Sequence, residues 1–340
     1  MKYLAVILLP LLFMGCVVDH SPEHSNRTAL RLYTLNWTLD GNHILVVSDT
    51  MRSDNGPLDQ IRDYDKNGTL LQYYPFFDRN TVNSTTVLLP TDDDSTCFFS
   101  TTLSIGGDYT LYRYFLASGS YLPIAGGSII AESSDARHLL IGSNVYPYNT
   151  NNFLVVDVSG SKPRLEKSWY DPVPQLYSGG VWIGSNHVGY LRDNSFNLVD
   201  FVITDTTGVK LDSFDVSGIS DFYGIQVFHG PGTIYFSERN GIMKYDSAAK
   251  TSSMLVQGII NSPDISPDGS FIVYVAADLG NQGSLMVVNT KTGASKVLAT
   301  TAENNIEGSV KVSPLGNQVA FIDNSSTYGG LLKILPVSAP

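Results

Sequence analysis

The sequence is poor in cysteine, in positive charge and in helical periodicity, and each shortage excludes a class of protein. Two cysteines in 340 residues cannot build the framework of several disulfides that stabilises small secreted domains. With 21 Lys and Arg against 32 Asp and Glu, the formal net charge is −11, so we expect no nucleic acid among the partners. No long stretch after the first sixteen residues has apolar side chains at helical spacing, which argues against a fold rich in helices.

Motifs of catalysis and cofactor binding are also missing. The chain has no G-x-S-x-G elbow, no H-E-x-x-H pair, no P-loop and no C-x-x-C pair. The stretch DYDKNG at residues 63–68 begins like a calcium-binding loop, but Tyr74 stands where that loop has its bidentate Glu. We therefore interpret it as a hairpin turn. We expect neither a cofactor nor a metal, and we favour a protein that is not an enzyme.

The first residues, MKYLAVILLPLLFMGC, combine one basic residue with an apolar run that is too short to span a bilayer as a mature helix. This segment resembles a bacterial lipoprotein signal, in which the cysteine after the apolar run becomes lipidated. We predict a signal peptide at residues 1–15, lipidation of Cys16, a tether at residues 16–27 and one domain at residues 28–340. An ordinary secretory signal that is cleaved nearby is the alternative.

The residue after the predicted lipidation site is Val17 rather than Asp. By the sorting habit of enteric lipoproteins, this resemblance implies the outer membrane of a bacterial cell envelope, with the domain facing the periplasm. The membrane would then be contacted through the lipid alone. The second cysteine, Cys97, lies in the apolar stretch TCFFS, so we expect a buried free thiol there.

A short pattern recurs along the chain. Residues 264–277 read DISPDGSFIVYVAA, and KVSPLGNQVAFID follows with its serine 47 positions after Ser266. Related stretches are TLDGNHILVVS from Thr38 and SSDARHLLIGS from Ser133, with weaker copies near residues 94, 186 and 231. These spacings fit seven copies of one unit.

Each unit reads as four strands separated by turns, with β-branched and aromatic residues in the strands and Gly, Asn, Asp and Ser in the turns. A four-stranded unit that repeats every ~40–50 residues is typical of a β-propeller. We predict an all-β fold, a seven-bladed β-propeller of four-stranded antiparallel blades. The last unit, LLKILPVSAP, ends at its third strand, so we expect the run TALRLYTL at residues 28–35 to pair with it and close the ring.

The S-P-D-G corner, together with the turn N-T-K-T-G after the third strand, resembles the WD40-like propeller repeats of TolB. The match is strong over residues 264–298, fair over 37–48, 133–158 and 311–323, and faint elsewhere. TolB also has a separate N-terminal domain, for which this chain has no room. The resemblance implies a propeller that binds proteins of the cell envelope.

Three histidines invite a metal-binding hypothesis that the repeat rejects. His43, His138 and His187 each begin the second strand of a unit, a place that Phe271 and Gln318 take in the last two units. Blades one, three and four are spread around a ring, so these side chains lie too far apart to ligate one ion.

In a propeller, the connections between the second and third strands and those between blades emerge at one face. Here they are the long irregular ones, and they combine arginine with an acidic neighbour and with tyrosine. Such a rim is favoured in protein interfaces, although solvated ion pairs would give the same composition. The residues that we predict to bind a partner are Arg52, Arg79, Tyr146, Tyr148, Arg192, Asp193, Tyr223, Glu238, Arg239 and Tyr328.

Three functions stay open at this point. The first is a lipid-anchored scaffold that binds an envelope protein. The second is an enzyme acting on a polysaccharide or a peptide. Similar propellers include oligogalacturonate lyases, which need clustered histidines and a metal, whereas a glycosidase would need two carboxylates, for which Asp193 and Glu238 are candidates. The third is a propeller that binds a glycan without catalysis.

Overall fold

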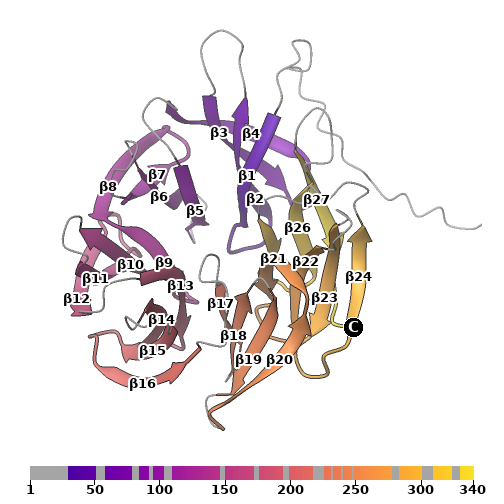
Figure 1. Ribbon diagram of the computed structural model, residues 1–340. Helices are drawn as coiled ribbons and strands as arrows, with labels where there is room; N and C mark the ends of the chain where they lie inside the picture. Colours follow the sequence, from indigo (N-terminus) through magenta and orange to yellow (C-terminus); the bar gives the residue numbers. More distant parts are fainter. Residues whose placement is uncertain are drawn as a thin grey trace, which may run out of the picture.

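A computed structural model shows seven β-sheets arranged as the blades of a propeller around a central axis (Figure 1). Six sheets have four strands, and the seventh has three among the described residues. The prediction of a seven-bladed propeller is therefore confirmed. The structure describes residues 30–50, 58–78, 84–91, 95–102, 109–145, 150–171, 176–193, 199–216, 226–230, 233–238, 240–246, 249–277, 283–300, 309–323 and 330–340.

Each blade comes from one continuous stretch of chain, and we name its strands A to D from the centre outward. Blades 1 to 4 contain β1 (Leu30–Trp37), β2 (His43–Thr50), β3 (Leu58–Asp65) and β4 (Leu70–Asp78); β5 (Ser84–Pro90), β6 (Thr96–Thr102), β7 (Tyr109–Phe115) and β8 (Ser120–Gly126); β9 (Ser128–Glu132), β10 (His138–Val145), β11 (Thr150–Asp157) and β12 (Arg164–Asp171); and β13 (Leu176–Ile183), β14 (His187–Asp193), β15 (Val199–Asp205) and β16 (Lys210–Asp215). Blades 5 to 7 contain β17 (Gln226–Gly230), β18 (Thr233–Glu238), β19 (Gly241–Asp246) and β20 (Thr251–Gln257); β21 (Ile259–Ile265), β22 (Phe271–Ala277), β23 (Gly283–Asn289) and β24 (Ser295–Thr300); and β25 (Val310–Val312), β26 (Gln318–Asp323) and β27 (Leu331–Pro336).

Strand pairing is antiparallel throughout the described blades, and it is most regular between the B and C strands. These two strands pair without a shift in register, as Phe271↔Asn289 through Ala277↔Gly283 illustrate. In every four-stranded blade, the C and D strands have at least one register shift, such as the one between Leu285 and Met286. A bulge of this kind increases the local twist, so the outer strand turns further than the inner ones.

The recurring S-P-D-G pattern forms the corner between strands A and B. In blade 6, the Ser266 hydroxyl donates to the Asp268 carboxylate at 2.7 Å and accepts from the Phe271 amide at 3.1 Å, while the Gly269 amide donates to the Ser266 carbonyl at 2.8 Å. Gly269 has a φ of 69°, a conformation that glycine adopts at little cost. The predicted tight turn is confirmed, and it explains why serine, aspartate and glycine keep this spacing.

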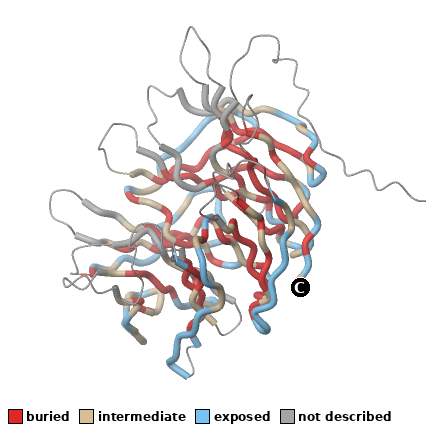
Figure 2. Tube along the Cα trace, turned by 45° about the vertical axis from the view of Figure 1, so that its right-hand side comes forward, coloured by how far each residue is buried: buried red, intermediate tan, exposed pale blue. Residues whose placement is uncertain are grey.

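The hydrophobic core is divided among the junctions between blades. Seven clusters of buried side chains occur, and each draws its members from two neighbouring sheets. Buried residues follow the inner strands of the ring, and the exposed segments lie toward its outside (Figure 2). A single sheet could bury neither face alone, so the ring is the unit that makes these sheets stable.

The expected closure of the ring is wrong. Residues 30–37 form β1, the inner strand of blade 1, which pairs with β2 and not with β27. Among the described residues, blades 7 and 1 meet through side chains, because Trp37 and Ile44 of blade 1 share a buried cluster with Ala320 and Ile322 of blade 7. We call this contact between blades 7 and 1 the seam.

Two further expectations concern single features of the chain. Cys97 is a free, fully buried thiol, as predicted, and its burial raises its pKa. Residues 1–29, which include the predicted signal segment, Cys16 and most of the tether, lie outside the described residues. Within the described ranges, we find no helix with the length and apolar character needed to cross a membrane.

Candidate functional site

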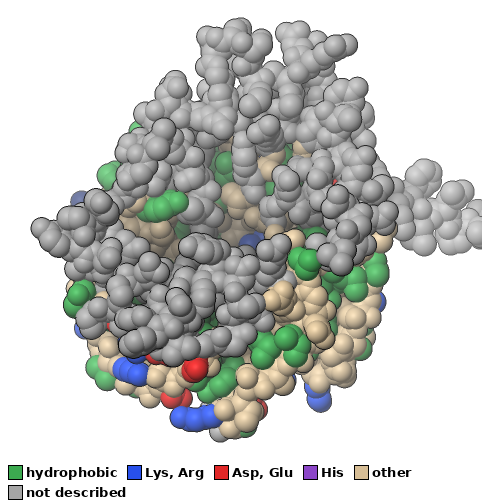
Figure 3. Space-filling view, in the orientation of Figure 1, with side chains coloured by type: hydrophobic (Ala, Val, Ile, Leu, Met, Phe, Trp, Pro, Cys, Tyr) green, Lys and Arg blue, Asp and Glu red, His purple; other side chains and the backbone are tan. Residues whose placement is uncertain are grey.

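The connections between strands differ at the two faces of the ring. The longest ones join B to C or D to the next A, and they run over residues 51–57, 216–225, 301–309 and 324–330. In an antiparallel meander, these two kinds of connection leave the sheets at the same end. We call that end the loop face. Figure 3 shows the ring hollowed at its centre.

Most of the predicted binding residues lie in these connections and outside the described residues. This holds for Arg52, Arg79, Tyr146, Tyr148, Tyr223, Arg239 and Tyr328. Asp193 and Glu238 are the last residues of β14 and β18, so their backbones reach the loop face of neighbouring blades. The predicted roles of these residues stay predictions.

Arg192 is the predicted binding residue whose side chain is described, and it is more buried than we expected of a rim arginine. Its side chain is 20% exposed and forms ion pairs with Asp171 at 3.4 Å and Asp200 at 3.5 Å. Asp171 belongs to blade 3, whereas Arg192 and Asp200 belong to blade 4. Arg192 therefore ties two blades together.

Tyr190 extends this tie. The Tyr190 hydroxyl donates a hydrogen bond to the Asp171 carboxylate at 2.9 Å. Burial raises the pKa of Tyr190, and the negative charge of Asp171 raises it further. A tyrosine that stays protonated keeps donating its hydrogen bond, so Asp171 of blade 3 keeps two donors from blade 4.

The face opposite the loop face carries the A–B corners, and the chemistry there is structural. The pKa of Asp268 is lowered by the amide and hydroxyl of Ser270 and by the Ser266 hydroxyl, and the pKa of Asp135 is lowered first by the Ser133 hydroxyl. The Oδ1 atom of each carboxylate accepts its hydrogen bonds from within its own turn. The DYDKNG stretch is likewise a turn, in which Asp65 accepts from the amides of Asn67 and Thr69.

The three histidines begin strands, as predicted, in blades 1, 3 and 4. His43 contacts Asp63 at 2.9 Å, His138 contacts Glu166 at 3.4 Å and stacks on Trp182, and His187 is exposed. In the part of the chain that the structure describes, no three His, Cys, Asp or Glu side chains come together as a set of metal ligands.

Charged groups that sequence reasoning missed lie on the inner A strands. Lys311 of blade 7 contacts Asp264 of blade 6 at 3.5 Å, and Asp264 also accepts from the Val312 amide at 2.7 Å. Burial raises the pKa of Glu132 to about 8, an effect that the positive charge of Lys311 opposes. Burial likewise raises the pKa of Asp264, again against Lys311.

Glu132 belongs to blade 3, and Lys311 belongs to blade 7. Charges from separated blades therefore interact across the inside of the ring. Burial disfavours the charged form of both carboxyl groups, and the positive charge of Lys311 opposes this effect at each of them. No local pattern in the sequence signals this, because it depends on how the ring closes.

The fold defines the class of protein as a seven-bladed β-propeller. The sequence matches no protein-family profile, and a comparison with curated proteins finds no significant match. Solved structures do resemble it. An oligogalacturonate lyase in complex with manganese is 15% identical, over 92% of this chain and 91% of its own, with a TM-score of 0.62.

Two further solved structures are similar to this chain. The β-propeller domain of the Trilobed protease from Pyrococcus furiosus, described as having an open velcro topology, is 14% identical over 91% of this chain and 98% of its own, with a TM-score of 0.60. TolB from Acinetobacter baumannii is 15% identical over 91% and 61%, with a TM-score of 0.47. At such identities, the likenesses to the lyase and to the protease domain show the fold alone and leave the function open.

Proposed function

We propose that this protein is a lipid-anchored propeller of the bacterial cell envelope that binds a protein partner through its loop face. The observation that carries the proposal is the distribution of connections, whose longest members all emerge at that face. Long connections on a rigid ring are where binding usually resides. On the opposite face, described turns such as the blade 6 corner are short and use the Asp268 carboxylate for hydrogen bonds within the turn.

The anchor is a separate part of this proposal, and it rests on the apolar run that ends in Gly15-Cys16. Lipidation of Cys16 would hold the propeller at the outer membrane, facing the periplasm. In cells, Cys16→Ser should move the protein from the membrane fraction to the soluble periplasm and remove the mass of the lipid. Unchanged fractionation and mass in this variant would contradict the anchor and leave the binding proposal standing.

The binding face is tested by crosslinking. A photo-reactive residue in place of Arg52 or Arg239 should capture a specific envelope protein, identified by mass spectrometry. The same residue in place of Lys66 or Lys291, exposed lysines on turns of the opposite face, should capture nothing specific. The reverse pattern would show that we have assigned the wrong face.

The energetic contribution is tested with arginine variants. Arg52→Ala combined with Arg239→Ala should lower the affinity for the captured partner by about thirtyfold if both side chains become buried on binding. Lys66→Ala combined with Lys291→Ala is the matched control and should leave affinity unchanged. Arg192 is unsuitable for this test, because its loss would also break the tie between blades 3 and 4. Polysaccharide turnover that Asp193→Asn and Glu238→Gln abolish would instead favour the enzyme hypothesis.

A further inference from the structure

A cavity lies on the outer half of blade 3, away from the central axis. It has a volume of about 440 Å³, and its described lining residues are Asn152 and Leu154 of β11 and Ser168, Trp169 and Tyr170 of β12. Ligand pockets typically measure ~300–1,000 Å³, so this one can hold a small ligand or one or two units of a polymer.

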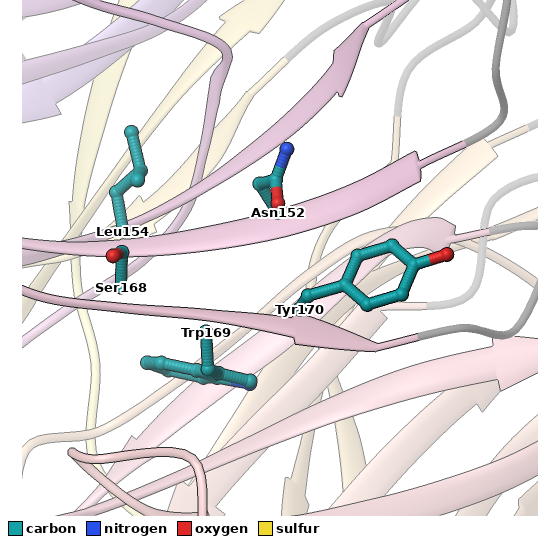
Figure 4. A pocket seen from close by; sticks show the side chains of 5 residues that line it. All are labelled: Asn152, Leu154, Ser168, Trp169 and Tyr170. Carbon is teal, nitrogen blue, oxygen red and sulfur yellow. The ribbon is translucent and has the colours of Figure 1, made fainter.

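The orientation of the side chains shows which face of the blade the cavity occupies. Asn152, Leu154 and Ser168 stand on the same side of the two strands, while the Trp169 ring points to the opposite side (Figure 4). Leu154 packs against the buried cluster that blades 2 and 3 share. The cavity therefore opens on the face of blade 3 that is turned toward blade 2.

The support behind the cavity is rigid. Trp169 stacks on Phe153 with ring centroids 5.1 Å apart, on the side that faces blade 4. A Cβ atom at Gly208 of blade 4 would lie 2.3 Å from the Trp169 ring, so the indole fills the space that this glycine leaves. Because Trp169 is fixed, the neighbouring residues Ser168 and Tyr170 are held in place as well.

The lining chemistry is polar but uncharged. Within the described residues, neither the Asn152 amide, the Ser168 hydroxyl nor the Tyr170 hydroxyl has a hydrogen-bond partner. An amide offers two donors and an acceptor, and each hydroxyl can both donate and accept. Tyr170 is 53% exposed, so an aromatic surface is available beside these groups.

This combination selects a class of ligand. A charged ligand would lose hydration without gaining a counter-charge from the lining, and an apolar one would bury the Asn152 amide unsatisfied. A pyranose ring has hydroxyl groups for the amide and hydroxyls and an apolar C–H face for an aromatic ring. We infer that this cavity is a binding site for a neutral oligosaccharide.

The inference is independent of the proposed protein partner, and it differs from recognition of an acidic polysaccharide. A uronate chain would meet no basic side chain among the described lining residues and would approach a protein of net charge −11.

Calorimetric titration with a panel of tetrasaccharides tests this inference. The panel contains β-1,4-glucan, α-1,4-glucan, β-1,4-mannan, β-1,4-galactan and β-1,4-N-acetylglucosamine units, with tetragalacturonate as the charged comparison. At least one neutral member should bind at concentrations up to about 10 mM, and tetragalacturonate should not. Binding of the uronate alone, or of no member, would overturn the inference.

Variants assign the binding to this cavity. Tyr170→Ala and Asn152→Ala should each lower the affinity for the neutral ligand about tenfold or more, and the midpoint of thermal unfolding should be unchanged. Tyr121→Ala is the matched control, because Tyr121 is an equally exposed tyrosine on a D strand, at 52%, and contacts Tyr112 of its own blade. Equal affinity in the Tyr170→Ala and Tyr121→Ala variants would place the sugar elsewhere. Capture of the protein partner should be unaffected by all three variants.

Discussion

The seam between blades 7 and 1 and the junction between blades 3 and 4 each bury a tryptophan near the end of an A strand. At the seam, the Trp37 indole donates to the Lys311 carbonyl at 3.0 Å. At the 3–4 junction, the Trp182 indole stacks on His138, and its buried N–H has no partner among the described residues. Trp37 thus links its two blades by a hydrogen bond, whereas Trp182 contributes hydrophobic packing.

The two junctions also differ in what else joins them. Blades 3 and 4 are consecutive in the chain and share the Asp171–Arg192–Asp200 ion pairs. Blades 7 and 1 share an apolar cluster and hydrogen bonds such as that from the Gln318 side chain to the Lys66 carbonyl at 3.3 Å. In the part of the chain that the structure describes, blades 7 and 1 meet through side chains, and we therefore expect the ring to open first at the seam.

Removing the seam tryptophan should have the largest effect. Trp37→Ala leaves a cavity and an unsatisfied carbonyl, and should cost about 3–5 kcal/mol. Hydrogen exchange should then increase in both blade 1 and blade 7. Trp182→Ala should cost a similar amount, with faster exchange confined to blades 3 and 4, which the chain keeps joined. Exchange that stays local in the Trp37 variant would show that the seam is no weaker than other junctions.

The ion pairs of the 3–4 junction come next in size. Arg192→Met removes the positive charge beside the largely buried carboxylate of Asp171, which Tyr190 still hydrogen-bonds, and should cost about 2 kcal/mol in the free energy of unfolding. Adding Asp171→Asn should restore part of that loss. A double-mutant cycle from denaturant unfolding measures the coupling, and additive losses would mean that the two residues do not interact.

Glu132 links the two regions, because it lies in blade 3 and senses Lys311 at the seam. Its pKa is raised from an ordinary 4.5 to about 8 in the folded protein, so the folded state binds more protons between these values and stability falls as pH rises through them. Glu132→Gln should therefore stabilise little at pH 4.5 and on the order of 1–2 kcal/mol at pH 8. Thermal unfolding at both pH values measures this, and a gain that does not depend on pH would contradict the assignment.

The smallest effect concerns the A–B corners. At the seam, Gly41 and Gly316 occupy the corner with φ of 70°, whereas blade 3 has Ala136 at 52° in the same place. Alanine is strained in this conformation, so Ala136→Gly should stabilise by about 0.5–1 kcal/mol. Gly316→Ala should destabilise by a similar amount. Calorimetry should therefore show a higher unfolding temperature for Ala136→Gly and a lower one for Gly316→Ala.

Much of this architecture follows from local patterns. The corner residues Ser266, Asp268 and Gly269 predict their own turn, because each hydrogen bond is made within a few residues of chain. The histidines that begin B strands follow from the same repeat. Closure of the ring did not follow, since the run at residues 30–37 reads equally well as the inner strand of blade 1 or as the missing outer strand of blade 7.

The candidate site was less predictable than the fold. An arginine next to an acid in a loop reads as a rim residue, but Arg192 has its partners in Asp171 and Asp200, which only the packing of two blades brings to it. The electrostatic influence of Lys311 on Glu132 depends on how the closed ring places blades 3 and 7. The neutral lining of the cavity on blade 3 combines alternate residues of two strands, and their shared face appears only once the register of β11 and β12 is known.

Each described sheet is made from one uninterrupted stretch of chain. This arrangement affects how the number of blades can change in evolution. A genetic duplication or loss of one unit would add or remove a whole sheet and would split none. A closure that shared strands between the first and last sheets would forbid such events at the ends. Because no described strand is shared between sheets, the number of blades is free to change, and a single recombination step could produce relatives of this protein with six or eight blades.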